Sequence, residues 1–255
     1  MTYENYEKWR DAPEERSVDL SVVIPAYNER ERIVPTIGAF AAHLAGIGLA
    51  WELIVSDDGS TDGTVDLVWS LGLANVRVLT APSNQGKGAA VRRGVASARG
   101  RTILFADADC STPAAELDYL LAELALGADV AIGSRAAAGA DVANRSVLRR
   151  VLTRGLNTVV RVGLAVPLED TQCGFKMFTA EAAQRLFRAQ TVDGFSFDLE
   201  ILYLARRVGM RVAEVPVRWY DAPGSKVNAR KEVVRFLQSI FQIRFNSLRG
   251  VYSNA

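Results

Sequence analysis

Apolar residues recur along the first half of the chain in short runs, separated by longer amphipathic stretches. The runs at 20–25, 51–55, 76–79 and 102–109 are rich in Val, Ile and Leu and have the length of buried strands. The stretches between them have the length and composition of helices. Strands alternating with helices at this regular spacing predict an α/β fold, a mostly parallel doubly wound sheet flanked by helices.

The second half of the chain is less regular. It predicts helices at 113–126, 180–188 and 196–208, strands at 129–133 and 211–220, and a turn feeding a strand at 170–178. Residues 142–168 are amphipathic and contain five arginines and no acidic residue before Glu169. Such a helix can lie on an anionic membrane surface or hold a phosphate, and it is equally consistent with a core-facing helix with a solvated basic face. A second amphipathic helix is predicted at 231–248.

Composition narrows the possible classes of protein. The chain has 255 residues, 49% hydrophobic and 23% charged, with a net charge of +1, so nucleic acid is not an expected partner. Cys110 and Cys173 have no metal-ligand spacing, which favours free thiols in a reducing compartment. His43 is the only histidine, which argues against histidine-based metal sites. No secretory signal or transmembrane span is predicted, so any membrane contact is expected to be peripheral.

Acidic residues follow two of the predicted strands where each strand ends. Asp107 and Asp109 end the run at 102–109, and Asp57 and Asp58 follow the run at 51–55. Ligands of open α/β sheets bind outside the carboxyl ends of the strands, and two carboxylates there can share a divalent cation with a diphosphate. Alone, such a pair is also typical of a polar turn and a helix cap. The Gly-Lys-Gly sequence around Lys87 could present backbone N–H groups and an ammonium to an anion, or be a surface loop.

Taken in order, these motifs resemble glycosyltransferase family 2, the inverting enzymes with the GT-A fold. The resemblance covers about residues 20–228 and rests on Val-Ile-Pro-Ala-Tyr-Asn-Glu, Asp-Asp-Gly-Ser-Thr-Asp-Gly-Thr, Asn-Gln-Gly-Lys-Gly and Asp-Ala-Asp. Gly-Ser-Arg, Asp-Thr-Gln-Cys-Gly-Phe-Lys, Phe-Asp-Leu-Glu and Gly-Ser-Lys make the second half most similar to dolichyl- or polyprenyl-phosphate glucosyltransferases. The resemblance implies a single domain over 1–255, with a nucleotide-sugar half (20–110), an acceptor half (111–225) and an amphipathic helical tail (226–250).

The resemblance also implies roles for individual residues. Binding of the nucleotide sugar is expected from Pro25, Tyr27, Glu29, Asp57, Asp58, Lys87 and Asp107, and Mg²⁺ or Mn²⁺ from Asp107 and Asp109. The acceptor phosphate is expected to contact Arg135, Arg149, Arg150 and Lys226, and the catalytic residues are expected to be Asp109, Asp170 and Arg135. Many mannosyl relatives carry a metal-binding Gln two residues after the second Asp, where this chain has Ser111, which leaves the other metal ligands open.

The expected reaction is transfer of a hexose, glucose from UDP-glucose, to a polyprenyl or dolichyl phosphate at the cytoplasmic face of a membrane. A phosphate monoester, whose second pKa is about 6, needs positioning by cations rather than a general base. A soluble or polysaccharide hydroxyl is the alternative acceptor, and it would need a base such as Asp170 or Asp198. A non-catalytic nucleotide-sugar-binding protein is a second alternative.

Overall fold

The computed structural model describes residues 18–142, 160, 163–220 and 229–253, and its centre is a seven-stranded sheet with strand order β3-β2-β1-β4-β7-β5-β8. The strands are β1 (Val18–Ala26), β2 (Trp51–Asp57), β3 (Val76–Thr80), β4 (Gly100–Ala106), β5 (Val130–Ser134), β7 (Phe175–Thr179) and β8 (Val212–Pro216). The strands β1 to β4 are mutually parallel, with Val22 opposite Leu53 and Leu104. The strand β7 runs antiparallel between β4 and β5. This confirms the predicted mostly parallel α/β sheet.

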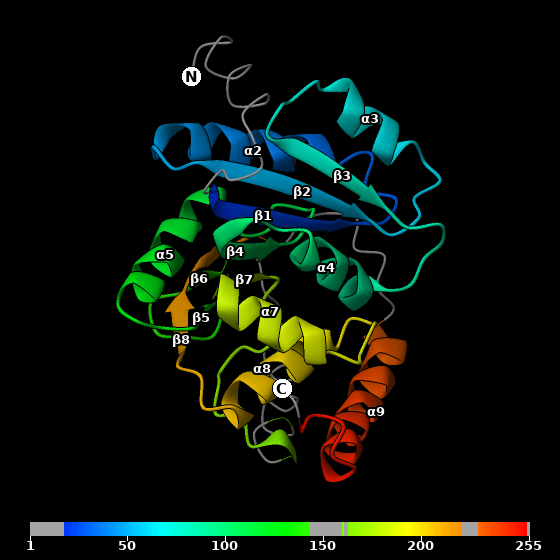
Figure 1. The fold of residues 1–255 in the computed structure, drawn as a ribbon, viewed down its shortest axis with the longest axis vertical. Helices are drawn as coiled ribbons and strands as arrows, with labels where there is room; N and C mark the ends of the chain where they lie inside the picture. The colour runs from blue at the N-terminus through cyan, green and yellow to red at the C-terminus, as the bar shows by residue number, and fades with distance from the viewer. Residues whose placement is uncertain (1–17, 143–159, 161–162, 221–228, 254–255) are drawn as a thin grey trace.

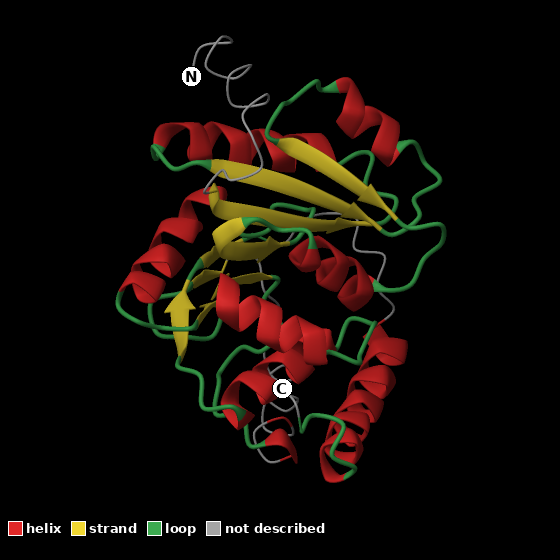
Figure 2. Ribbon diagram, in the orientation of Figure 1, coloured by secondary structure: helices red, strands yellow, loops and turns green. Residues whose placement is uncertain are grey.

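Helices cover both faces of the sheet, as Figures 1 and 2 show. The helices α2 (Ile33–Gly46), α3 (Thr64–Ser70) and α5 (Leu117–Ala125) pack on one face, and α4 (Lys87–Ala96), α7 (Ala180–Ala189) and α8 (Phe197–Arg207) pack on the other. The alternation of strand side chains separates two cores. On β4, Leu104 faces the core formed with α2 and α5, while Ile103 and Phe105 face the core formed with α4, α7 and α8.

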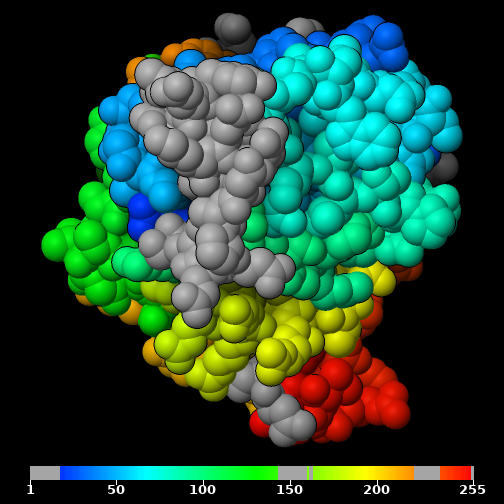
Figure 3. All heavy atoms as spheres, turned by 45° about the horizontal axis from the view of Figure 1, so that its top comes forward, coloured from blue at the N-terminus to red at the C-terminus, as the bar shows by residue number. Residues whose placement is uncertain are grey.

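The helix α9 (Ala229–Leu248) lies at the end of the molecule opposite α2 and α3, where it is the red segment of Figures 1 and 3. It confirms the helix predicted at 231–248. Ile240 and Ile243 are buried against the core that contains α8, whereas Phe241, Phe245 and Leu248 are exposed. Among the described residues, no helix combines the length and the apolar character needed to cross a bilayer.

Two predicted elements differ from the structure. The strand predicted at 211–220 is broken after Pro216, and β9 (Arg218–Trp219) leaves the main sheet to pair with β6 (Asp141–Val142). The helix predicted at 113–126 begins as a short 3₁₀ turn (Ala114–Glu116) before α5. The break at Pro216 matters for the site, because it turns Trp219 toward the carboxyl edge of β5. Most of the helix predicted at 142–168 lies outside the described residues.

Candidate active site

The carboxyl ends of β1, β2 and β4 lie at one edge of the sheet, which we call the carboxyl edge. From β1 the chain crosses to β2 on one side, and from β3 it returns to β4 on the other side of β1. The chain connections therefore run in opposite directions on the two sides of the boundary between β1 and β4. Ligands of open α/β sheets bind at such a point. The loops that carry Tyr27, Asp58, Lys87 and Asp107 all follow strands that end there.

Asp107, the first residue after β4, forms an ion pair with Lys87. Its Oδ1 lies 2.6 Å from Lys87 Nζ, and the lysine is the first residue of α4. Burial lowers the pKa of Lys87, but the charges of Asp107, Asp198 and Asp109 more than offset this and raise it overall. The ammonium also lies 5.2 Å from the centre of the Phe105 ring. Lys87 is therefore a permanently charged group beside the predicted metal and diphosphate site.

Gly174 explains how the Asp107 carboxylate fits against the loop before β7. The backbone N–H of Asp107 donates to Gly174 O at 3.0 Å. A Cβ at position 174 would overlap the Asp107 carboxylate, so no other residue type fits there without a shift of backbone or carboxylate. The glycine belongs to the Asp-Thr-Gln-Cys-Gly-Phe-Lys motif, which sequence reasoning associated with the acceptor rather than with Asp107.

Asp109 lies two residues further on, in a turn where Cys110 has a left-handed backbone with φ of 53°. The backbone N–H of Ser111 donates to Asp109 Oδ1 at 3.0 Å. Within the described part of the chain, Oδ2 of Asp109 has no hydrogen-bond partner. The turn therefore fixes the side chain and leaves one carboxylate oxygen available to a ligand.

Asp57 and Asp58 are both buried, and their carboxylates hold loops. Asp57 Oδ2 accepts hydrogen bonds at 3.1 Å from the backbone N–H groups of the glycine and serine that follow in the Asp-Asp-Gly-Ser motif. Asp58 Oδ2 accepts from Gln85 N at 3.0 Å and from Gly86 N at 2.7 Å. Asp58 thus ties the end of β2 to the loop that delivers Lys87. Their expected contact with the base and ribose stays a prediction.

The loop after β1 is held by the loop after β2. Asn28 N donates to Ser60 Oγ at 2.8 Å, and Glu29 N donates to Thr64 Oγ1 at 3.0 Å. Tyr27 remains 45% exposed, so its ring is free to stack on a ligand. The Glu29 carboxylate, in contrast, is paired with Arg32. Pro25 is the second-last residue of β1 and lies opposite Ser56 of β2 in the sheet. It therefore lies where the strand leads into this loop.

Arg135 and Asp170 form a two-pronged ion pair after β5. Arg135 Nε lies 2.6 Å from Asp170 Oδ2, Nη2 lies 2.9 Å from Oδ1, and the Arg135 backbone N–H also donates to Oδ2 at 3.0 Å. Although burial opposes the change, Arg135 lowers the pKa of Asp170 to about 2, and Asp170 in turn raises the pKa of Arg135. The guanidinium lies 5.5 Å from the centre of the Trp219 ring. Asp170 is therefore a very weak base that orients Arg135.

A second buried ion pair lies on the adjacent strand. Lys176 is the second residue of β7 and is 1% exposed, and its Nζ lies 2.7 Å from Asp198 Oδ1 on α8. The same ammonium donates to Cys173 O at 2.5 Å. Burial raises the pKa of Asp198, and Lys176 and Lys87 only partly counter this.

Sequence reasoning named Asp198 but assigned no role to Lys176, Gly174 or Trp219. A lysine within Phe-Lys-Met-Phe is a detectable signal, because a charge in an apolar strand requires a buried partner. The contribution of Trp219 depends on the break of the strand at Pro216, for which the sequence gives less warning. Arg149, Arg150 and Lys226, expected at the acceptor phosphate, lie outside the described residues.

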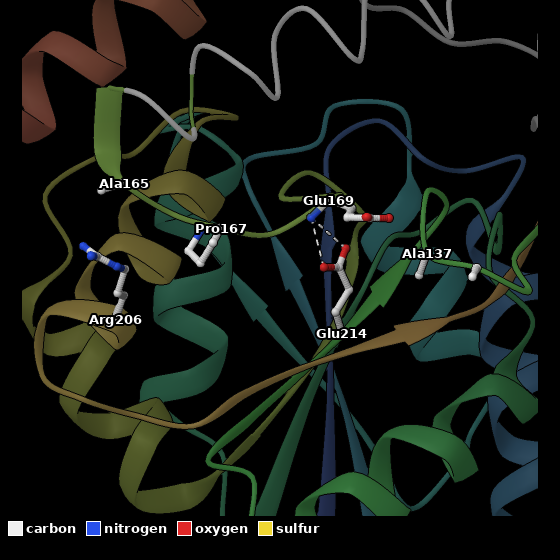
Figure 4. Close-up of a pocket in the computed structure, with 7 residues that line it drawn as sticks. Ala137, Ala165, Pro167, Glu169, Arg206 and Glu214 are labelled. Atoms are coloured by element: carbon white, nitrogen blue, oxygen red, sulfur yellow. Dashed lines mark hydrogen bonds between the residues drawn. The ribbon is translucent and has the colours of Figure 1, made fainter.

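Two cavities lie beside the residues of the carboxyl edge. The smaller one lies against Asp107 and is lined by Ala106, Asp107, Ser111, Thr112, Gly174, Phe175 and Trp219. The larger one, of about 680 Å³, is lined by Ala137, Ala138, Ala165, Pro167, Glu169, Arg206 and Glu214. Figure 4 shows Glu214 bound to the backbone of Glu169 in its wall, and Glu214 also accepts from Asp170 N at 2.8 Å. The larger cavity therefore adjoins the Arg135–Asp170 pair, whereas the smaller one contains the predicted metal ligand.

The family model for glycosyl transferase family 2 matches residues 21–187, which include most of β1, all of β2 to β4, and Arg135, Asp170 and Lys176. The chain therefore belongs to glycosyl transferase family 2 and is a glycosyltransferase. Among its relatives, dolichyl-phosphate beta-glucosyltransferase of Drosophila melanogaster is 39% identical over 92% of this chain and 77% of the fly protein. The Homo sapiens protein of the same name is 35% identical, over 91% of this chain and 77% of its own length.

Solved structures show the same fold at lower identity. Glucosyl-3-phosphoglycerate synthase from Mycobacterium tuberculosis, in complex with Mn²⁺ and UDP-glucose, aligns with a TM-score of 0.65 at 21% identity, over 94% of this chain and 83% of that one. Mannosyl-3-phosphoglycerate synthase from Rubrobacter xylanophilus aligns with a TM-score of 0.67 at 19% identity, over 91% and 74% of the two chains. These alignments confirm the predicted GT-A architecture.

Proposed function

We propose that this enzyme transfers glucose from UDP-glucose to a dolichyl or polyprenyl phosphate. The names of its relatives supply the sugar and the lipid acceptor, and the site supports a phosphate acceptor. One observation carries the argument: the two carboxylates that could activate a hydroxyl, Asp170 and Asp198, are each paired with a cation. A hydroxyl acceptor needs a carboxylate that is free to take its proton, whereas a phosphate monoester is already largely dianionic at neutral pH.

On the donor side, Asp107 and Asp109 are suited to hold Mg²⁺ or Mn²⁺ together with the diphosphate. Both are half-buried carboxylates with hard oxygen donors, and Oδ2 of Asp109 is available to a ligand. Among the described residues there is no cluster of three His, Cys, Asp or Glu ligands, which suits an ion that completes its shell with phosphate oxygens and water. Binding of Mn²⁺ and UDP-glucose by the M. tuberculosis neighbour supports the same donor here. A bound cation would supply Lewis-acid stabilisation of the leaving diphosphate.

Lys87 supplies a second positive charge for the diphosphate. Its side chain is mostly buried and its raised pKa keeps it protonated at neutral pH. A preorganised charge in a site of low dielectric stabilises the negative charge that develops as the sugar–phosphate bond breaks. Asp58 holds the loop before Lys87 through Gln85 N and Gly86 N, and Gly174 O accepts from the backbone of Asp107, so the backbone around both groups is fixed.

On the acceptor side, Arg135 is the group placed to meet the phosphate. Asp170 occupies its Nε and Nη2, while Nη1 has no partner among the described residues. An arginine held in this way by a carboxylate and an aromatic ring presents the remaining N–H donors in a fixed direction. Arg149, Arg150 and Lys226 are further candidates for this phosphate on the basis of the family resemblance.

A peripheral position on the cytoplasmic face of a membrane follows from a lipid-linked acceptor. The helix α9 exposes Leu237, Phe241, Phe245 and Leu248, with Arg244 among them and Arg249 against the ring of Phe245. Aromatic and aliphatic side chains with interspersed arginines are typical of helices that lie in the plane of an anionic interface.

The alternative is a soluble or polysaccharide hydroxyl acceptor, and Asp198 is the observation that favours it. Its raised pKa would suit a general base if its carboxylate were free. The experiment is to follow UDP release from UDP-glucose with Mg²⁺ or Mn²⁺, with and without a short isoprenyl phosphate. Release that requires both the cation and the isoprenyl phosphate supports the proposal. Donor-specific release that is indifferent to the lipid would assign the acceptor to a hydroxyl, and the absence of any turnover would favour a non-catalytic binding protein.

A further inference from the structure

The Lys176–Asp198 pair is a buried ion pair near the site that the proposed reaction does not use. Lys176 lies on an interior strand of the sheet, opposite Phe105 on β4 and Ile132 on β5. An ammonium in such a position is costly unless it is paired and hydrogen bonded. Its charge meets Asp198 Oδ1 at 2.7 Å, and Cys173 O takes a further hydrogen bond at 2.5 Å.

The pair is close to the donor side of the site. Both lysines lie near the ring of Phe105, with Lys176 Nζ at 5.9 Å and Lys87 Nζ at 5.2 Å from its centre. Phe195, two residues before α8 begins, also lies near Lys87, with its ring centre 5.6 Å from Nζ. Asp198, in the first turn of α8, is therefore close enough to Lys87 for its charge to raise the pKa of that lysine.

We propose that Lys176 sets the acceptor class of this enzyme by pairing with Oδ1 of Asp198, which weakens that carboxylate as a proton acceptor for a hydroxyl. This inference rests on the proposed function. With the ion pair intact, an acceptor must arrive already ionised, as a phosphate does. Lys176 acts through Asp198 and is a positioning residue, since it contacts neither substrate in the proposed reaction.

The reaction that Lys176 suppresses can be written in full. The oxygen of an alcohol or of water attacks the anomeric carbon of the glucose, and a carbon–oxygen bond forms. The bond from that carbon to the diphosphate oxygen breaks, and the UDP leaves with the electron pair. The proton of the attacking hydroxyl passes to the Asp198 carboxylate and then to solvent. General-base assistance of this kind contributes about 10²–10⁴-fold to the rate when the base is free.

The test measures UDP release with three acceptors: a short isoprenyl phosphate, the isoprenyl alcohol of the same chain length, and water alone. In Lys176→Met, the ratio of transfer to the alcohol or water over transfer to the phosphate is expected to rise by ~10-fold or more. Lys176→Gln, which keeps a donor toward Cys173 O, is the second variant should Lys176→Met fail to fold. Adding Asp198→Asn to either is expected to abolish the gain, and Lys176→Arg is expected to keep the wild-type ratio.

The matched control is Arg77→Met. It removes a cation from a buried carboxylate, Glu52, at the opposite edge of the same sheet, and it is expected to lower stability without changing the acceptor ratio. A Lys176→Met or Lys176→Gln enzyme that loses all transfer activities in proportion, with no gain that depends on Asp198, would overturn the inference. The proposed function has its own test, which compares acceptors in the wild type and involves no variant. It fails if the wild type prefers the alcohol to the phosphate.

Discussion

The two edges of the central sheet both contain buried carboxylates paired with cations, but the pairs are built differently. At the amino edge, Glu52 is fully buried and accepts from Ser21 Oγ at 2.7 Å and Arg99 N at 2.7 Å. Arg77 and Arg99 also approach its other oxygen, at 2.8 and 2.9 Å. This group satisfies both carboxylate oxygens within the chain, so it is suited only to hold the ends of β1, β2 and β4 together.

At the carboxyl edge, two charged groups have hydrogen-bonding atoms that no other described residue uses. Among the residues that the structure describes, Asp109 Oδ2 and Arg135 Nη1 have no hydrogen-bond partner, and both side chains are partly exposed. An incomplete set of partners costs free energy in the folded state but leaves groups preorganised for a ligand. The comparison therefore predicts that substitutions at the carboxyl edge change activity more than stability, and that substitutions at the amino edge do the reverse.

The largest effect is expected for Asp109→Ala. Loss of a predicted metal ligand should lower kcat/KM by ~10³-fold, because charge stabilisation of the leaving group is among the largest contributions to catalysis. The melting temperature should change by only a few degrees, since Asp109 is half-exposed and makes one hydrogen bond. The measurements are UDP release and thermal unfolding monitored by circular dichroism. Near-normal turnover in the variant would remove Asp109 from the proposed site.

The reciprocal substitution, Glu52→Gln, is expected to cost stability. Breaking a buried ion pair costs ~3–5 kcal/mol, and the lower end applies because the side chains of Arg77 and Arg99 are 37% and 45% exposed and can turn to solvent. Turnover per folded molecule should stay within about twofold, because the group is remote from the predicted ligands. Urea unfolding and UDP release on the same preparation test both statements. A large loss of kcat in a folded Glu52→Gln protein would contradict the division between the two edges.

The sequence predicted the amino half of the fold well and the acceptor half less completely. The strands β1 to β4 are continuous apolar runs that end in polar residues, so both their existence and their shared edge could be inferred. The ion pairs of Arg135 with Asp170 and Lys176 with Asp198 could not, because the partners lie 35 and 22 residues apart and meet only through the antiparallel insertion of β7. Local periodicity contains no information on that insertion.

The predicted role of Asp170 shows the same limit. The sequence allowed it to be either a base or a neighbour of the acceptor, and only the geometry shows a carboxylate whose pKa falls to about 2 beside Arg135. The binding roles assigned to Asp57 and Asp58 remain predictions, since their carboxylates are hydrogen bonded to loop backbone.

A smaller, selective effect is expected for Arg135→Lys. A lysine keeps the charge but cannot bridge both oxygens of Asp170 and still present a donor to the acceptor. The KM for the isoprenyl phosphate should rise by ~10-fold, while the dissociation constant for UDP-glucose changes by less than ~2-fold. Steady-state kinetics with each substrate varied in turn, and calorimetry for the donor, separate the two quantities. Equal losses for donor and acceptor would indicate a general distortion of the site.

The smallest effect concerns the stability of the two edges in acid. Glu52 and Asp170 both have pKa values lowered in the folded state, so each contributes stability that is present above its unfolded pKa and lost as the pH falls through its folded pKa. For Glu52 the loss of stability begins below pH 4.5. For Asp170 it begins below pH 3.8 and continues to about pH 2, and it amounts to about 2 kcal/mol in total.

Urea unfolding of the wild type, Glu52→Gln and Arg135→Met from about pH 6 down to about pH 3 measures these contributions separately. Acidification should narrow the gap in stability between the wild type and each variant. A gap to Arg135→Met that stays constant down to about pH 3 would mean that Asp170 does not depend on Arg135 for its low pKa. In that case Asp170 would again be a candidate general base. The argument for a phosphate acceptor would then rest only on the ion pair that Lys176 forms with Asp198.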